Sequence, residues 1–305
     1  MSAGNPPIND ENDGGGAGVR AAPAGEDAPV VLITGASSGI GHATARRFAA
    51  RGWRVWASMR QPERGEALRL EARERGWALE TPALDVTDDA SVARATAGLL
   101  AATGGRIDLL VNNAGFYSLG ACEDTTPDEL RAQLETNVIG VHRVTRAVLP
   151  AMRARRRGRV MVISSLSGLV ALPALGAYQA SKFALEAWTE TLRSEVRPFG
   201  IEVVMLEPGP FATNLHVNER PAAASQSPAS PYGPLMAQYQ RKSTGMRRAS
   251  LPLLINTIER AATVARPRLR WPVGPSAFQA AYLRRLSPDW LYEWVVRLAF
   301  RIRRA

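Results

Sequence analysis

Two residues stand at a spacing that suits acid–base chemistry: Tyr178 and, four residues later, Lys182. The chain has only two lysines among its 38 Lys and Arg residues, so nearly every positive charge is an arginine. A lysine at this position indicates a role for a compact ammonium, which a planar guanidinium does not replace. On a helix the two side chains share a face, and the ammonium would lower the pKa of the phenol from about 10 toward neutrality. The pair predicts a general acid/base; a core tyrosine beside an ordinary helical lysine is the alternative.

A glycine-rich turn follows the first apolar run, in the sequence Thr34-Gly-Ala-Ser-Ser-Gly-Ile-Gly41. Its glycines allow a tight turn and a close approach of the backbone to a phosphate, and the next helix offers free N–H groups to a pyrophosphate. The predicted cofactor-binding residues of this turn are Gly35, Ser37, Ser38, Gly39, Ile40 and Gly41. The same residues also fit the nucleophile elbow of a serine hydrolase. That turn should follow several strands, whereas only the leader precedes the strand that begins at Val30 and runs into this turn.

The end of the second apolar run indicates which nicotinamide cofactor would bind. Dinucleotide sites that take NAD(H) usually place an acid there, bonded to the ribose 2′-hydroxyl. Here Met59 stands near the expected acid and Arg60 follows it. A guanidinium suits a 2′-phosphate, so NADP(H) is predicted over NAD(H).

Apolar, β-branched runs alternate with segments of helical period along residues 29–275, which predicts one α/β domain. The fold class is a single Rossmann-type, doubly wound parallel sheet of about seven strands with helices on both faces. The predicted strands are 30–34, 54–58, 79–84, 107–112, 159–164, 201–206 and 269–273. The predicted helices include 40–50, 92–102, 126–155 and 177–196.

Composition distinguishes the two ends of the chain from this domain. Residues 1–28 are rich in Gly, Ala and Pro and carry five acids against one arginine, so a disordered leader is expected, without the pattern of a signal or transit peptide. Residues 276–305 form a basic tail, and no apolar run approaches the roughly 18 residues of a membrane span. One cysteine, Cys122, and three separated histidines predict no metal site and favour a cytoplasmic setting.

The net charge of +10 raises the question of a nucleic-acid partner. The arginines cluster at 153–159 and beyond residue 251, without interleaved aromatic residues or a nucleic-acid motif. Cations at the ends of helices explain such clusters better, because they offset the negative end of the macrodipole. We therefore expect no nucleic acid as a partner.

Six motifs in register resemble the short-chain dehydrogenase/reductase family across about residues 29–215, with similarity to its steroid and retinol dehydrogenase branch. They are the glycine turn at 34–41, Asn112-Asn-Ala-Gly115, Asn137, Ser165, Tyr178-x3-Lys182 and Pro208-Gly209. The resemblance implies a nicotinamide-dependent enzyme that interconverts an alcohol and a carbonyl compound. It also implies a homodimer or homotetramer.

The resemblance assigns roles to single residues. Tyr178 would move the proton of the substrate hydroxyl, Ser165 would bind the substrate oxygen, and Lys182 would bind the nicotinamide ribose and lower the pKa of the tyrosine. Asn137 would kink its helix and hold a water in a proton relay. The remaining cofactor contacts implied are Asp85, Val86, Asn112, Ala114, Gly115, Pro208, Gly209 and Thr213.

The predicted substrate pocket is apolar, with Phe116, Tyr117 and Leu166 in its walls and a lid at about residues 210–250. These walls favour an apolar alcohol or ketone, and the resemblance to the steroid and retinol dehydrogenase branch implies a steroid-, retinoid- or lipid-like substrate. Two other functions stay open: a catalytically silent NADP(H)-sensing regulator, and an epimerase or dehydratase on the extended version of the fold.

An apolar stripe of helical period runs through the tail: Leu291, Trp294, Val295, Leu298 and Ile302. A basic amphipathic helix with tryptophan can lie on an anionic membrane surface. We favour instead that it docks on its own domain or on a partner subunit.

Overall fold

A parallel sheet of seven strands forms the centre of the computed structural model, which describes residues 25, 27–211, 219–245, 248–274, 284 and 286–302. The strands are β1 (Val30–Ile33), β2 (Arg54–Ala57), β3 (Leu79–Glu80), β4 (Leu109–Asn112), β6 (Gly158–Ile163), β7 (Ile201–Pro208) and β9 (Arg270–Val273). Their order across the sheet is β3-β2-β1-β4-β6-β7-β9, and all neighbouring pairs are parallel. The predicted α/β fold and its seven strands are confirmed.

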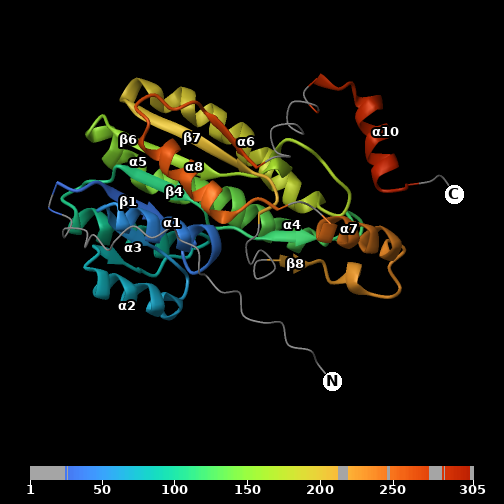
Figure 1. Cartoon of the computed structure of the whole chain (residues 1–305), viewed down its shortest axis with the longest axis horizontal. Helices are drawn as coiled ribbons and strands as arrows, with labels where there is room; N and C mark the ends of the chain where they lie inside the picture. The colour runs from blue at the N-terminus through green and yellow to red at the C-terminus, as the bar shows by residue number, and fades with distance from the viewer. Residues whose placement is uncertain are drawn as a thin grey trace.

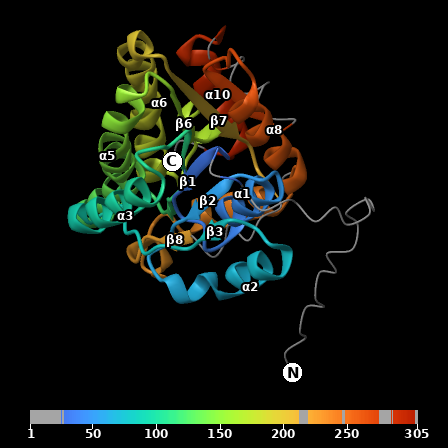
Figure 2. The same ribbon diagram turned by 90° about the vertical axis from the view of Figure 1, so that its left-hand side faces the viewer.

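Helices cover both faces of this sheet (Figures 1 and 2). They are α1 (Gly39–Ala50), α2 (Glu66–Arg75), α3 (Asp89–Ala102), α4 (Pro127–Leu134), α5 (Gly140–Ala154), α6 (Gly176–Val196), α7 (Gly233–Gly245), α8 (Leu251–Thr263) and α10 (Asp289–Ala299). Val31 and Ile33 of β1 pack in the core beneath α1 and α8, whereas Val30 and Leu32 pack in the core beneath α3, α5 and α6. This alternation, with all four side chains buried, shows why the strand is apolar at every position.

The direction of strand order reverses between β1 and β4, because the chain proceeds outward from β1 through β2 and β3 before it returns to β4. In such sheets the loops at the carboxyl ends separate at the reversal and leave a crevice there. The fold therefore gathers the segments that follow β1, β2, β4, β6 and β7 at one edge.

The predicted helical segment 126–155 is helical over residues 127–154, and it is interrupted at Asn137, where a kink was expected. A capping box starts α4, in which Thr126 and Glu129 bond to each other's backbone N–H, and a π-helical turn at Glu135–Ile139 then separates α4 from α5. A π-turn widens the helix by one residue and commonly marks a functional position. Asn137 lies within this turn.

A second, two-stranded sheet ties the predicted lid to the domain. Strand β8 (Glu219–Pro221) pairs in parallel with β5 (Tyr117–Leu119), so main-chain hydrogen bonds hold the lid against the segment after β4. From the lid helix α7, Met236 and Tyr239 pack in a cluster that includes Tyr178. Residues 1–24 and 26 of the predicted leader, and Thr213, lie outside the described residues.

The tail contributes helix α10, which touches the domain along one side. The hydroxyl of Tyr292 donates to the carbonyl of Ala171, and Phe300 is buried with the ammonium of Lys242 5.5 Å from its ring centroid. Most of the predicted apolar stripe is exposed: Trp294, Val295, Leu298 and Ile302, together with the neighbouring Trp290. Its own domain therefore does not cover the stripe among the described residues, and docking on a partner subunit stays a prediction. None of the helices in these ranges is long and apolar enough to cross a membrane.

Candidate active site

A cavity of about 690 Å³ opens at the edge where the strand order reverses. Most of the residues predicted from the sequence line it, in an arrangement that brings the glycine turn and the Tyr178–Lys182 pair to one space. The predicted residues that line the cavity are Gly35, Ser37, Ser38, Gly39, Ile40, Arg60, Asp85, Val86, Ala114, Gly115, Phe116, Tyr117, Ser165, Tyr178, Lys182, Pro208 and Gly209.

Tyr178 and Lys182 lie one turn apart at the start of α6, which begins directly beside the end of β6. The ammonium of Lys182 donates a hydrogen bond of 2.8 Å to the carbonyl of Ile163, the last residue of β6, and lies 5.8 Å from the ring centroid of Tyr178. The ring of Tyr117 packs edge-on against Tyr178 at 5.8 Å. The phenol therefore sits between an ammonium and an aromatic wall.

Burial dominates the electrostatics of this pair. It raises the pKa of Tyr178, with the hydrogen bond to Ser165 acting in the opposite direction. It also lowers the pKa of Lys182 from 10.5 to about 8, against the attraction of the Glu186 carboxylate. The expectation that the ammonium lowers the pKa of Tyr178 toward neutrality is wrong for the chain by itself, because desolvation penalises both charges.

The two neighbouring serines at the end of β6 have different partners. Ser165 begins a 3₁₀ turn (Leu166–Gly168), and its hydroxyl accepts a hydrogen bond of 3.1 Å from the N–H of Ser167. Ser164 is buried and its hydroxyl bonds to the carboxylate of Glu186. Only Ser165 therefore keeps its hydroxyl toward Tyr178.

Asn137 supports the site from beneath rather than lining the cavity. Its side-chain amide donates to the carbonyl of Phe116 at 3.0 Å and to the hydroxyl of Ser181 at 3.1 Å, and its oxygen accepts from the N–H of Phe116 at 3.2 Å. The π-turn thus joins the segment after β4 to the helix that carries Tyr178.

The glycine turn has the geometry of an anion cradle. Gly35 has φ +67, and a Cβ there would lie 2.7 Å from the Cα of Ala114, so a larger residue would push the two loops apart. The helix α1 that follows starts without a side-chain cap or an acid in its first turn. Its free N–H groups and positive dipole end therefore remain available for a phosphate.

Two arginines and one aspartate line the far end of the cavity. Among the described residues, Arg60 and Arg64 have no carboxylate partner in an ion pair, so both guanidinium groups are available to an anion. Asp85 is held differently: its carboxylate accepts from the N–H of Thr87 at 2.9 Å and from the hydroxyl of Thr87 at 2.8 Å. Arg64 was not predicted from the sequence, because it lies in a short 3₁₀ turn beyond the β2 motif.

Four predicted residues do not line the cavity. Asn112 is buried and donates to the hydroxyl of Thr145 at 2.9 Å; its neighbour Asn113 faces the cavity instead. Gly41 lies where α1 packs closely, since a Cβ there would meet the side-chain nitrogen of Asn113 at 2.5 Å. Asn137 and Leu166 are the other two.

A cluster of buried charges, missed in the sequence, lies directly behind Lys182. Arg270 of β9 lies 2.8 Å from a carboxylate oxygen of Glu186 and 2.9 Å from one of Glu207, and it also bonds to Glu190. The contact between Arg270 and Glu207 lacks hydrogen-bond geometry. Burial and the nearby Glu186 raise the pKa of Glu207 to about 8. The available signal was an acid four residues after Lys182, but its partners lie on distant strands.

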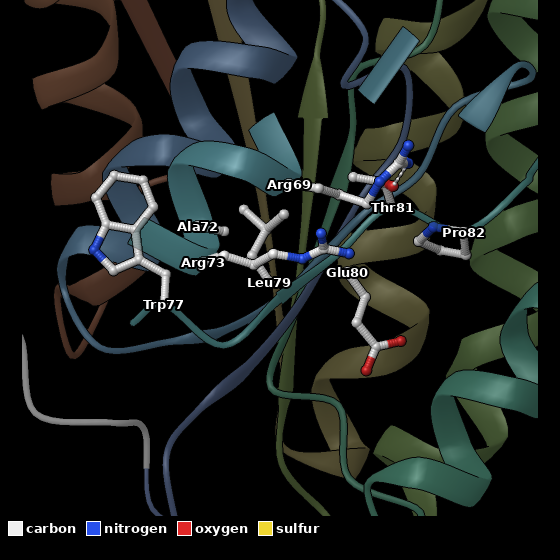
Figure 3. A pocket seen from close by; sticks show the side chains of 8 residues that line it. All are labelled: Arg69, Ala72, Arg73, Trp77, Leu79, Glu80, Thr81 and Pro82. Carbon is white, nitrogen blue, oxygen red and sulfur yellow. Dashed lines mark hydrogen bonds between the residues drawn. The ribbon is translucent and has the colours of Figure 1, made fainter. Parts of the chain in front are cut away.

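A second hollow, of about 380 Å³, lies between α2 and the edge strand β3 (Figure 3). Arg69 spans it and is fully engaged, donating to the hydroxyl of Thr81 at 2.6 Å and to the carbonyl of Pro62 at 2.7 Å. Its walls carry no acid–base pair like Tyr178 and Lys182. We therefore place the functional site in the larger cavity.

Comparisons with known proteins agree with this placement. A family model described as "short chain dehydrogenase" matches residues 29–224. The uncharacterized oxidoreductase YusZ of Bacillus subtilis is 43% identical over 61% of this chain and 66% of that protein. The 3-ketodihydrosphingosine reductase of Bacteroides thetaiotaomicron is 40% identical over 62% of this chain and 66% of that protein. These alignments thus span just under two thirds of the relatives' lengths.

Solved structures share the fold over most of the chain. A short-chain dehydrogenase from Streptomyces avermitilis superposes with a TM-score of 0.76 at 37% identity, covering 84% of this chain and 92% of that one. A metagenomic short-chain oxidoreductase in complex with NADP gives a TM-score of 0.65 at 28% identity, covering 81% and 97%. A Burkholderia phymatum homologue in complex with NAD gives 0.73 at 25% identity, covering 85% and 93%. Structures with either nicotinamide cofactor therefore resemble this chain.

The raised pKa of Glu207 predicts how stability depends on pH. The neutral carboxyl is favoured in the folded protein, so its contribution is fully present below the ordinary pKa of 4.5 and is lost as the pH rises through about 8. Glu207→Gln removes this titration, so we expect a melting temperature above that of the native protein at pH 8 and no such gain at pH 4.5. Thermal unfolding at both pH values measures it. Glu202→Gln, on the same strand but 42% exposed, serves as the control. An equal change at both pH values would contradict the prediction.

Proposed function

Because this chain belongs to the short-chain dehydrogenase/reductase family, we propose that it is an NADP(H)-dependent oxidoreductase that interconverts a primary or secondary alcohol and its carbonyl compound. One observation carries the proposal: Ser165, Tyr178 and Lys182 line the same cavity as the glycine turn and the uncapped start of α1. A proton-transfer group and a phosphate cradle are the two things that such a reaction requires of the protein.

The residues present fit a nicotinamide dinucleotide. The free N–H groups of α1 would hold the pyrophosphate, Asp85 and Ala114 would lie along the adenosine, and Pro208 and Gly209 would flank the nicotinamide. When bound, the cofactor donates or accepts the hydride.

Side chains of the protein would bind the substrate oxygen, move its proton and exclude water. Tyr178 would deliver a proton to the carbonyl oxygen as it becomes a hydroxyl, or remove that proton in the opposite direction. Ser165 would hydrogen-bond the same oxygen and orient it. The apolar cluster around Tyr178, with Tyr117, Met236 and Tyr239, would exclude water from the transfer.

Arg60 and Arg64 support the preference for NADP(H). Neither has a carboxylate partner among the described residues, both line the cavity beside Asp85, and no acid follows β2 at 58–61. Two guanidinium groups suit the dianionic 2′-phosphate through charge-assisted hydrogen bonds.

The walls of the cavity support an apolar substrate of steroid, retinoid or lipid type. Phe116, Tyr117 and Phe211 contribute aromatic surface to the cavity, and α7 closes over Tyr178. One relative is, by its name, a 3-ketodihydrosphingosine reductase. A homodimer or homotetramer in the cytoplasm completes the proposal, with the single Cys122 as support for a reducing setting.

The exposed stripe of α10 supports peripheral contact with an anionic membrane. Trp290 and Trp294 are 70% and 58% exposed, and Arg297 and Arg301 flank the stripe. Aromatic and apolar side chains bordered by arginines match the interface of a bilayer that carries negative headgroups. Such contact would bring the cavity close to a lipid-soluble substrate.

The reaction itself is tested with a panel of apolar ketones and aldehydes and the absorbance of NADPH. We expect turnover by the native protein and a loss of at least about 100-fold in kcat for Tyr178→Phe, since acid–base groups typically contribute this much. Affinity for NADPH should stay nearly unchanged. Tyr232→Phe, a tyrosine whose hydroxyl bonds to Glu123, is the matched control and should keep full activity. Tight NADPH binding without turnover of any carbonyl would favour the silent sensor.

The cofactor preference is tested by binding of NADPH and NADH to native protein and Arg60→Ala. Loss of one charge-assisted contact should weaken NADPH binding by about 10-fold or more and leave NADH binding nearly unchanged. Arg94→Ala, on the unrelated helix α3, is the control. Tighter binding of NADH than NADPH by the native protein would refute the preference.

The membrane contact is tested by flotation with vesicles that contain about 30% phosphatidylserine. The double change Trp294→Asp and Leu298→Asp should release the full-length protein from these vesicles, because it puts charges on the apolar face. Leu70→Asp on α2, at a similarly exposed leucine, should not. If the stripe instead joins two subunits, the double change would dissociate the oligomer, and the native protein would not float.

A further inference from the structure

Three residues on one face of α6 form a continuous polar row: Tyr178, Lys182 and Glu186, each one turn after the last. Lys182 and Glu186 are both buried, with 8% and 5% of their surfaces exposed. An isolated buried ammonium is costly and tends to lose its proton, unless an opposite charge lies nearby. The carboxylate that can keep Lys182 charged is the next member of the row.

Lys182 and Glu186 also bind neighbouring residues at the carboxyl end of β6. The ammonium of Lys182 donates to the carbonyl of Ile163, and the carboxylate of Glu186 accepts from the hydroxyl of Ser164, the following residue. Ser165, the proposed oxygen-binding residue, comes next. Gly168 completes the packing, since a Cβ there would meet the Cγ of Glu186 at 2.8 Å and the carbonyl of Lys182 at 3.1 Å.

Arg270 fixes the carboxylate of Glu186 from the other side. It lies 2.8 Å from Glu186 and ties this residue to β9, while Glu207 of β7 contributes a carboxyl group with a raised pKa. With its pKa at about 8, Glu207 is mostly neutral near pH 7. Burial raises the pKa of Glu186 as well, but the hydrogen bond from Ser164 and the guanidinium of Arg270 favour its charged form. The groups around this pair are Tyr178, Lys182, Glu190, Glu207, Arg268 and Arg270.

We propose that Glu186 is a positioning residue for proton transfer: its buried carboxylate, held by Ser164 and Arg270, keeps Lys182 charged behind Tyr178. The inference rests on the proposed function, because it assigns the source of the positive charge that the phenolate needs. The active form, a charged lysine beside a phenolate, holds one titratable proton on the pair. Without that carboxylate, the same single proton would lie on the tyrosine, beside a neutral lysine. A change of pH would not convert one into the other.

The scarcity of lysine makes this proposal directly measurable. Only Lys182 and Lys242 would give signals in full-length protein labelled with [ε-¹³C]lysine, and Lys242→Arg assigns them. The ¹³C shift of each Cε follows its protonation, so a pH titration gives the midpoint of Lys182 without any substrate.

We expect the midpoint of Lys182 in Glu186→Gln to fall by at least about one pH unit, because an opposite charge one helical turn away favours the charged lysine. A fall of one unit from about 8 would lower the charged fraction at pH 8 about fivefold, and kcat with it. Glu190→Gln is the matched control: Glu190 bonds to the same Arg270 on the next turn, but its side chain is 49% exposed. Its midpoint should stay unchanged.

If Glu186→Gln does not fold, Glu186→Leu takes its place, because leucine fills the space with an apolar side chain. The same fall in the titration midpoint of Lys182 is expected. A folded variant whose Lys182 titrates as in the native protein would overturn the proposal, as would a native midpoint below 7. The native protein's failure to turn over any carbonyl would refute the proposed function instead, since the titration does not depend on it.

Discussion

The hydrogen bond from the ammonium of Lys182 to the carbonyl of Ile163 is the contact on which the site depends. It joins the first turns of α6 to the carboxyl end of β6, and so sets Tyr178 relative to Ser165. The contact lies in a desolvated region, where a charge is stable only with fixed partners. The charged cluster of Glu207 on β7, Arg270 on β9 and Glu186, one turn beyond Lys182, supplies them. The same contacts therefore fix the catalytic geometry and hold α6 against the sheet.

Much of this arrangement could be predicted from the sequence. The central strands are buried on both faces and apolar at almost every position, so they were recognisable, and the glycine turn and the Tyr178–Lys182 spacing are local patterns. Most of the predicted residues line one cavity, because the carboxyl ends of parallel strands meet at one edge. Period and spacing of this kind require no knowledge of distant contacts.

What escaped prediction depends on contacts between segments far apart in the chain. Arg270 and Glu207 lie 84 and 21 positions from Glu186 along the chain. No local pattern in the sequence predicts that these three residues are in contact. The direction of the pKa shift of Tyr178 was also wrong, because helical spacing reveals the neighbouring charge but not the depth of burial. Strand β8 is only three residues long and contains a proline, so its pairing with β5 left no periodic signal.

That pairing has a consequence for how the protein could diversify. The lid is held on the domain by main-chain hydrogen bonds between β8 and β5, and these depend little on side-chain identity. Side-chain bonds hold the residues after β8 as well, since Ser225 and Ser230 bond to Asp124 and Tyr232 bonds to Glu123. Lid positions outside these contacts and outside the cluster around Tyr178 can therefore be replaced while the lid keeps its place above the cavity. In a chimera that exchanges lids between relatives, the junction should therefore lie after β8, so that this strand stays intact.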